Sequence, residues 1–169
     1  MKFEEPNSMI FTGQYTATTN KSFVIFLVGI RINNLWALHK WIPFVTRLFL
    51  LRKHLKKNNH SSLLNTKTWY SRREIMLVQY WHSLESLETF AHSEMEPHLV
   101  SWREYNTKIG KSADIGVWHE TYFVDKRNFE SIYNNMPRSG LALATNHCSI
   151  SDIMDRGSLK ILRTNTSKR

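Results

Sequence analysis

Residues 114–124, DIGVWHETYFV, constrain the fold more than any other stretch of the chain. Their β-branched and aromatic side chains favour a strand, in which neighbouring side chains point to opposite faces of the sheet. Both faces of this strand are therefore largely apolar, and each also carries a titratable group, His119 on one and Glu120 on the other. A strand of this kind needs cover on both faces, because large apolar patches are rarely left in water.

Hydrophobic periodicity predicts the elements that surround this strand. Residues 22–32 are a continuous apolar run, which is typical of a strand buried on both faces. Residues 35–57 have the spacing of an amphipathic helix, with Pro43 near its first turn or at a kink. Four more segments follow the same rules. They are a hairpin of strands at 63–70 and 74–81, a helix opened by the cap-like Ser83, and a helix from Pro97 to about residue 109.

The resulting order is β-α-β-β-α-β, the ferredoxin-like arrangement of an α+β protein. Both helices then cover one face of a four-stranded antiparallel sheet, and nothing in this count covers the other. The simplest cover is a second copy of the chain. We therefore predict a homodimer in which two sheets face each other and enclose a cavity.

The two ends of the chain show no sustained hydrophobic periodicity. We expect residues 1–20 to form a flexible leader that includes one short extended piece, and residues 21–136 to form the folded domain. Residues 128–134 are expected to add one helical turn, and residues 137–169 to be a mostly disordered basic tail. The single cysteine, Cys148, excludes an internal disulfide and a multi-cysteine zinc site. It favours a cytoplasmic setting.

The formal net charge of +9 is unevenly distributed. Residues 31–60 contain seven Lys or Arg and no acidic residue. A charge run of this kind is usually a solvated face, and no nucleic-acid module accompanies it, so we expect no specific nucleic-acid binding. The most apolar stretch, residues 23–30, is far shorter than a membrane span requires.

Five segments together resemble a bacterial family of monooxygenase-like proteins of the dimeric α/β-barrel class, related to phenylacetaldoxime-dehydratase gene regions. The segments are NNLWALHKWIPF, LVQYWHSLESLETFAHS, HLVSWREYN, DIGVWHETY and YNNMPRSGLA, and the resemblance covers about residues 23–141. It implies the ferredoxin-like fold and the homodimer. The wider class includes cofactor-free monooxygenases of aromatic polyketides, haem-degrading proteins, haem enzymes such as aldoxime dehydratases, and stress proteins, so fold alone does not choose the reaction.

The candidate catalytic residues are His119, His98 and Glu120. One of His119 and Glu120 is expected to line the cavity as a base or ligand, while the other anchors the helices or the dimer seam. The alternative is structural: a histidine satisfied by a hydrogen bond, and a carboxylate paired with Arg or Tyr. His98 shares a helix face with Trp102 and Tyr105, either as core or as pocket.

The candidate cofactor is haem or none. A histidine between aromatic rings is what a haem pocket would offer, so His98, Trp102 and Trp118 are the candidate cofactor-binding residues. HExxH, phosphate-loop and dinucleotide motifs are missing from the sequence, and we expect no metal site. A cavity rich in aromatic side chains suits a flat apolar ligand, although aromatic residues are also the usual core. The candidate ligand-pocket residues are Trp36, Asn33, Tyr80, Trp81 and Tyr105.

Three functions are compatible with these features. The first is a small-molecule monooxygenase-like enzyme that acts on an apolar or aromatic ligand, with a histidine removing a proton or ligating haem. The second is a non-catalytic dimeric module for ligand binding or sensing, in which every pocket histidine is hydrogen-bonded to the protein. The third, binding to nucleic acid or a membrane surface, rests on charge alone.

Overall fold

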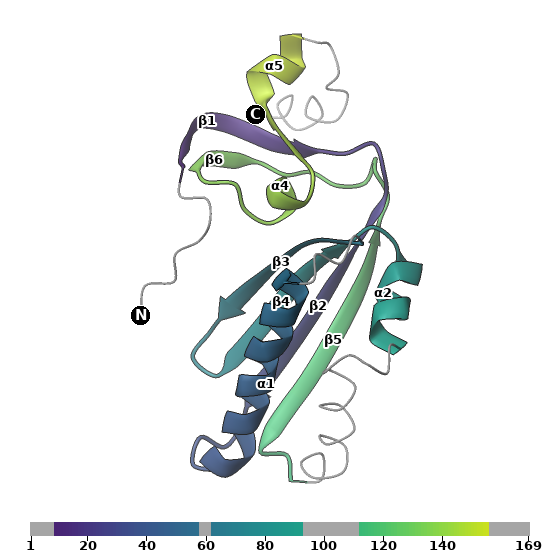
Figure 1. Ribbon diagram of the computed structural model, residues 1–169. Helices are drawn as coiled ribbons and strands as arrows, with labels where there is room; N and C mark the ends of the chain where they lie inside the picture. Colours follow the sequence, from purple (N-terminus) through teal and green to yellow (C-terminus); the bar gives the residue numbers. More distant parts are fainter. Residues whose placement is uncertain (1–8, 58–61, 93–111, 156–169) are drawn as a thin grey trace, which may run out of the picture. The chain divides into compact units, whose positions relative to one another are not determined.

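The computed structural model describes residues 9–57, 62–92 and 112–155 (Figure 1). The chain forms two compact units. The main unit is Lys21–Arg127, and the small unit combines Met1–Asn20 with Asn128–Arg169.

The main unit contains a four-stranded antiparallel sheet in the order β3-β4-β2-β5. Its elements confirm the predicted ferredoxin-like order, with the predicted helix 97–109 lying outside the described residues. In chain order the elements are β2 (Phe23–Ile32), α1 (Leu38–Lys57), β3 (Leu63–Tyr70), β4 (Glu74–Trp81), α2 (Leu84–His92) and β5 (Ile115–Val124).

Strand β2 is an inner strand of the sheet, and its apolar run contributes side chains to both faces. It pairs with β4 from Val24 to Arg31 and with β5 from Phe23 to Ile32, so both of its edges are hydrogen-bonded over almost their whole length. A central strand exposes no backbone edge to water, which explains why an uninterrupted apolar sequence is stable there.

Helices α1 and α2 pack on the same face of this sheet, which we call the helix face. Phe44 of α1 is buried against Ile30 and Ile115, and Leu87 of α2 against Val24 and Trp81. Val24 and Ile30 are an even number of residues apart on β2 and therefore share a face. Among the described helices, none has the length and apolar content needed to cross a membrane.

Local sequence sets the helix ends. The hydroxyl of Ser83 accepts a hydrogen bond from the backbone N–H of Ser86, and the hydroxyl of Ser86 accepts one from the N–H of Ser83. This reciprocal cap confirms the helix start predicted at Ser83. Pro43 lies in the second turn of α1, within the helix.

The opposite face of the sheet has no helix on it within the described part of the main unit, and we call it the open face. Its side chains are half-buried or exposed for the most part, and many are apolar or aromatic. By alternation and register it includes Ile25, Leu27 and Gly29 of β2, Met76, Val78 and Tyr80 of β4, Lys67 and Trp69 of β3, and Trp118, Glu120 and Tyr122 of β5.

The small unit contains a second antiparallel sheet, in the order β6-β1-β7. Its strands are β1 (Phe11–Thr18), β6 (Tyr133–Met136) and β7 (Asn146–Ser149), with short helices α4 (Leu141–Ala144) and α5 (Ile150–Asp155).

This sheet differs from the sequence-based expectation. Strand β1 lies within the leader, where one short extended piece was expected, and residues 141–155 hold three elements where a mostly disordered tail was expected. Strand β6 begins within residues 128–134, where a helical turn was expected. The strands β6 and β7 are four residues long, too short for a period to be read, and they are held by pairing with the distant β1.

Candidate functional site

His119 and Glu120 face opposite sides of the sheet. His119 pairs with Val28 and Glu120 with Leu27. Val28 lies between Phe26 and Ile30 in the alternation of β2, on the helix face, so His119 faces the helices. Glu120 therefore belongs to the open face.

His119 lies between the two core clusters of the helix face. Phe26, on one side, belongs to the cluster under α2, and Val117, on the other, to the cluster under α1. The imidazole ring is exposed, and its centroid lies 5.9 Å from that of the Phe26 ring. Within the described residues nothing hydrogen-bonds to this ring, whose two nitrogens can donate or accept a hydrogen bond.

Glu120 has a partner on its own strand. The Tyr122 hydroxyl donates a hydrogen bond of 2.6 Å to Glu120 Oε2, and both side chains are exposed on the open face. The carboxylate raises the pKa of Tyr122, first through this hydrogen bond and then through its charge. The pair matches the structural alternative considered for Glu120, a carboxylate paired with a tyrosine.

Trp118 lies across Gly29 on the open face. An added Cβ at Gly29 would lie 2.6 Å from Cε2 and from Nε1 of the indole, so this approach depends on a residue without a side chain. Tyr80 shares this face, and Lys67 Nζ lies 4.7 Å from the centroid of the Trp69 ring. Gly29 was not singled out from the sequence, although an isolated glycine within a strand is a known sign of close approach.

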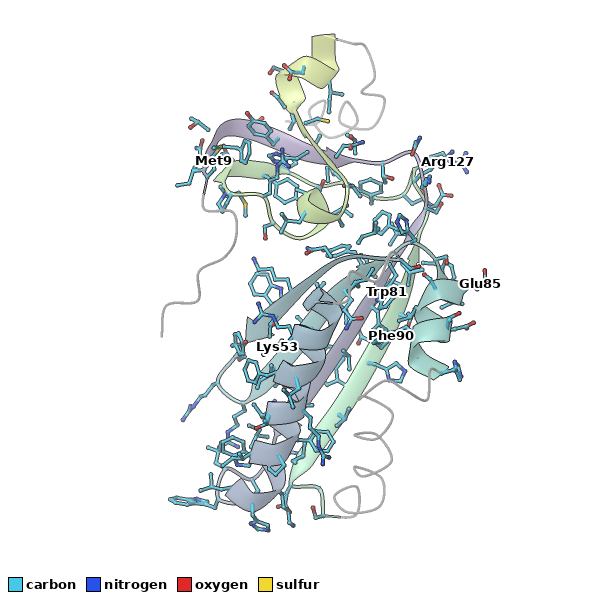
Figure 2. All side chains as sticks on the ribbon, in the orientation of Figure 1. Met9, Lys53, Trp81, Glu85, Phe90 and Arg127 are labelled. Atoms are coloured by element: carbon cyan, nitrogen blue, oxygen red, sulfur yellow. The ribbon has the colours of Figure 1, made fainter. Side chains whose placement is uncertain are left out.

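Trp81 has a core position in place of the predicted pocket role. It is 1% exposed, and its Nε1 donates a 2.9 Å hydrogen bond to the buried Gln79 Oε1. Figure 2 shows Trp81 of β4 near Phe90 of α2, and their ring centroids are 5.1 Å apart. This packing is the structural role that large aromatic side chains most often have.

Asn33 and Trp36 lie in the connection from β2 to α1, away from His119. Asn33 Nδ2 donates to the carbonyl of Ala113 at 2.9 Å, which fixes the connection to the residues before β5. Trp36 is 92% exposed. Beside them, hydrogen bonds from Lys40 and Asn34 lower the pKa of Asp114 to about 2, with the Lys40 bond as the largest cause.

Three of the predicted site residues, His98, Trp102 and Tyr105, lie outside the described residues. Among the remaining candidates on the sheet, the structure places some side chains on the helix face and others on the open face. His119 and Trp81 are on the helix face, whereas Trp118, Glu120 and Tyr80 are on the open face. Within the described residues, no group of three His, Cys, Asp or Glu side chains could hold a metal ion.

His147 in the small unit was missed by the sequence analysis. Its ring stacks on Tyr15 with centroids 4.6 Å apart and meets the edge of Phe11 at 4.8 Å. Both ring nitrogens are buried, with no hydrogen-bond partner in the described part of the chain. Burial, followed by the positive charge of Arg138, lowers the pKa of His147.

Comparison with solved structures defines the class of fold. The chain is similar to aldoxime dehydratase in complex with butyraldoxime, with a TM-score of 0.66 and 13% identity over 83% of this chain and 44% of that one. A second aldoxime dehydratase structure gives a TM-score of 0.66 and 14% identity over 83% of this chain and 45% of that one. At these identities the similarity establishes the α+β ferredoxin-like fold.

The sequence then identifies the family. The chain belongs to the Monooxygenase af470-like family, whose model matches residues 23–141, and the predicted monooxygenase-like resemblance is thereby confirmed. It is 25% identical over 122 residues to Monooxygenase af470 of Aspergillus fumigatus, a match that covers 68% of this chain and 43% of that protein. The chain thus spans less than half the length of the relatives that it matches.

Proposed function

We propose that the chain is a homodimeric, monooxygenase-like enzyme that binds a small apolar or aromatic molecule beside His119, on the helix face of its sheet. The observation that carries this proposal is the exposed His119 ring, which lies next to Phe26 and has no hydrogen-bond partner among the described residues. A non-catalytic binding module would have its pocket histidine bonded to the protein, so a ring without a hydrogen bond from the described residues supports the enzyme.

The proposed site differs in position from the cavity between two facing sheets that the sequence suggested. A cavity between two facing sheets would be lined by open-face residues such as Trp118 and Glu120. His119 faces away from that cavity, because it is on the other side of β5. We therefore assign the dimer interface and the reactive histidine to opposite faces.

The homodimer is proposed from the open face. This face combines half-buried apolar side chains, among them Leu27, Met76 and Val78, with the exposed aromatic Trp69. A two-fold axis would pack the open face of one copy on that of the other, as two sheets pack in a sandwich. The lone thiol of Cys148 is free, which suits the reducing, cytoplasmic setting that we include in the proposal.

In the cofactor-free version His119 acts as the base. A neutral imidazole takes a proton from an acidic CH₂ group of the bound molecule and leaves a carbanion that reacts with dioxygen. The substrate supplies all four electrons that reduce dioxygen: CH₂ becomes C=O, one oxygen atom enters the product, and the other leaves in water. Phe26 provides an apolar surface beside the reacting group.

The haem version is tested by the residues that would hold the group. His119 would be the residue that holds haem, because no described residue bonds to its nitrogens. Trp118 does not fit the same site, because it lies on the open face. When bound, haem would supply the redox chemistry, while His119 would hold it and Phe26 would pack beside it. A Soret band after expression with added haem, lost in His119→Gln, would support this version.

The adjacent residues of β5 provide a matched pair of variants. With anthrone as the probe, we expect His119→Gln to slow oxygen consumption by about a hundredfold or more, the usual loss when a general base is removed. Glu120→Gln should leave the rate within about threefold. Quenching of tryptophan fluorescence by anthrone measures binding separately. A loss in Glu120→Gln alone would place the site on the open face, and no loss in either variant would favour the binding module.

A further inference from the structure

Two connections meet at one end of the main unit. The loop 33–37 follows β2, and the turn 71–73 joins β3 to β4. The backbone N–H of Ile32 donates to the carbonyl of Arg73 at 2.8 Å, and Arg73 Nη1 donates to the carbonyl of Asn33 at 3.3 Å. We call residues 33–38 and 71–73 the tip.

The tip exposes apolar side chains on a fixed backbone. Trp36 is 92% exposed and Leu38 is 50% exposed. Two hydrogen bonds hold the loop. The N–H of Trp36 donates to Asn34 Oδ1 at 3.1 Å, and Trp41 Nε1 donates to the carbonyl of Leu35 at 3.1 Å. An indole held in solvent by a hydrogen-bonded loop indicates an interaction surface.

The net charge around the tip is positive. Among the described residues, its surroundings contain four cations, Arg31, Lys40, Arg72 and Arg73, and two acids, Glu74 and Asp114. Both acids are already paired, Glu74 with Arg31 at 2.6 Å and Asp114 with Lys40. The remaining cations are Arg72, which is exposed, and Arg73, so the tip has an excess of two positive charges.

We infer that the tip docks on the surface of an anionic lipid bilayer, independently of the proposed enzymatic site. Tryptophan is enriched at the level of the lipid headgroups, where its apolar ring and polar N–H are both satisfied. Trp36 and Leu38 enter the boundary between headgroups and acyl chains, while Arg72 and Arg73 meet the lipid phosphates. Contact of this kind requires no membrane-spanning helix.

Co-sedimentation of the full chain with vesicles tests the inference. We expect binding to phosphatidylcholine vesicles that contain phosphatidylglycerol, little binding to pure phosphatidylcholine, and a decrease with salt. Trp36→Ala should weaken binding by about tenfold or more, and Arg72→Gln by about fivefold. Matched controls elsewhere on the surface are Phe123→Ala, where the side chain is 68% exposed, and Lys126→Gln; both should bind as the wild type does.

A second readout separates insertion from charge alone. Brominated phosphatidylcholine in the anionic vesicles should quench part of the fluorescence of the six tryptophans, and Trp36→Ala should lose that quenched part. Three results would overturn the inference: no binding to anionic vesicles, equal binding by Trp36→Ala, or a Trp36→Ala variant that changes the oligomeric mass without lipid. The last result would make the tip a protein interface.

Discussion

The indole of Trp118 covers the backbone of Gly29, the residue with which it pairs on the neighbouring strand. Only hydrogen at the Gly29 Cα allows this contact, since a Cβ would lie 2.6 Å from two indole atoms. The two residues together place an aromatic ring over the backbone of β2 on the open face.

Gly29→Ala should therefore destabilise the main unit. The added methyl group displaces the Trp118 ring, and overpacking of this kind costs about 1–3 kcal/mol of unfolding free energy. Urea unfolding followed by fluorescence measures the loss. Gly116→Ala is the matched control on the same face, because its added Cβ would have its nearest neighbour at 3.7 Å, and it should change the free energy of unfolding by less than about 0.5 kcal/mol. Equal tolerance of both substitutions would contradict the close approach.

Asp114→Asn should destabilise the connection between α1 and β5 at neutral pH. The pKa of Asp114 is lowered from 3.8 to about 2, so its carboxylate contributes stability above pH 3.8. That contribution is lost as the pH falls from 3.8 through about 2, because the folded state must then take up a proton it resists. Acid titrations by circular dichroism should show the two proteins converging near pH 2. The exposed Glu130→Gln should follow the wild type throughout.

His147 should make the small unit sensitive to mild acid. Its pKa is lowered below 6.5, so the folded state binds fewer protons than the unfolded state as the pH falls through 6.5. Stability is complete above pH 6.5 and decreases below it. His147→Phe keeps a ring against Tyr15 and removes two buried nitrogens that lack a partner, so it should be more stable and less dependent on pH.

Thermal unfolding by near-ultraviolet circular dichroism, above and below pH 6.5, measures this difference. His82→Gln, a change at an exposed histidine, is the control and should retain the dependence of the wild type. The same dependence in His147→Phe would show that another group is responsible.

Much of the main unit could be predicted from the sequence, because its elements carry strong periods. The hairpin strands at 63–70 and 74–81 have the predicted bounds, and β2 begins one residue later than predicted. Helix α1 begins at Leu38, three residues later than predicted, since Asn34 and Leu35 are held in the loop by hydrogen bonds.

The face that each site residue occupies could not be predicted in the same way. Alternation requires that His119 and Glu120 point to opposite faces, but only the register with Val28 assigns His119 to the helix face.

The small unit was missed because its strands depend on distant pairs such as Thr18 with Asn146, which no local sequence pattern indicates. Trp81 and Trp36 show the related difficulty, since composition does not distinguish a buried tryptophan from one that is 92% exposed.

Sedimentation equilibrium of the purified full chain tests the central claim most directly, that a second copy covers the open face. We expect a mass of twice 20.0 kDa, and a shift toward the monomer when Val78→Lys places a charge on the half-buried open face. A mass of 20.0 kDa at every concentration would show that the open face meets solvent, and would contradict the account.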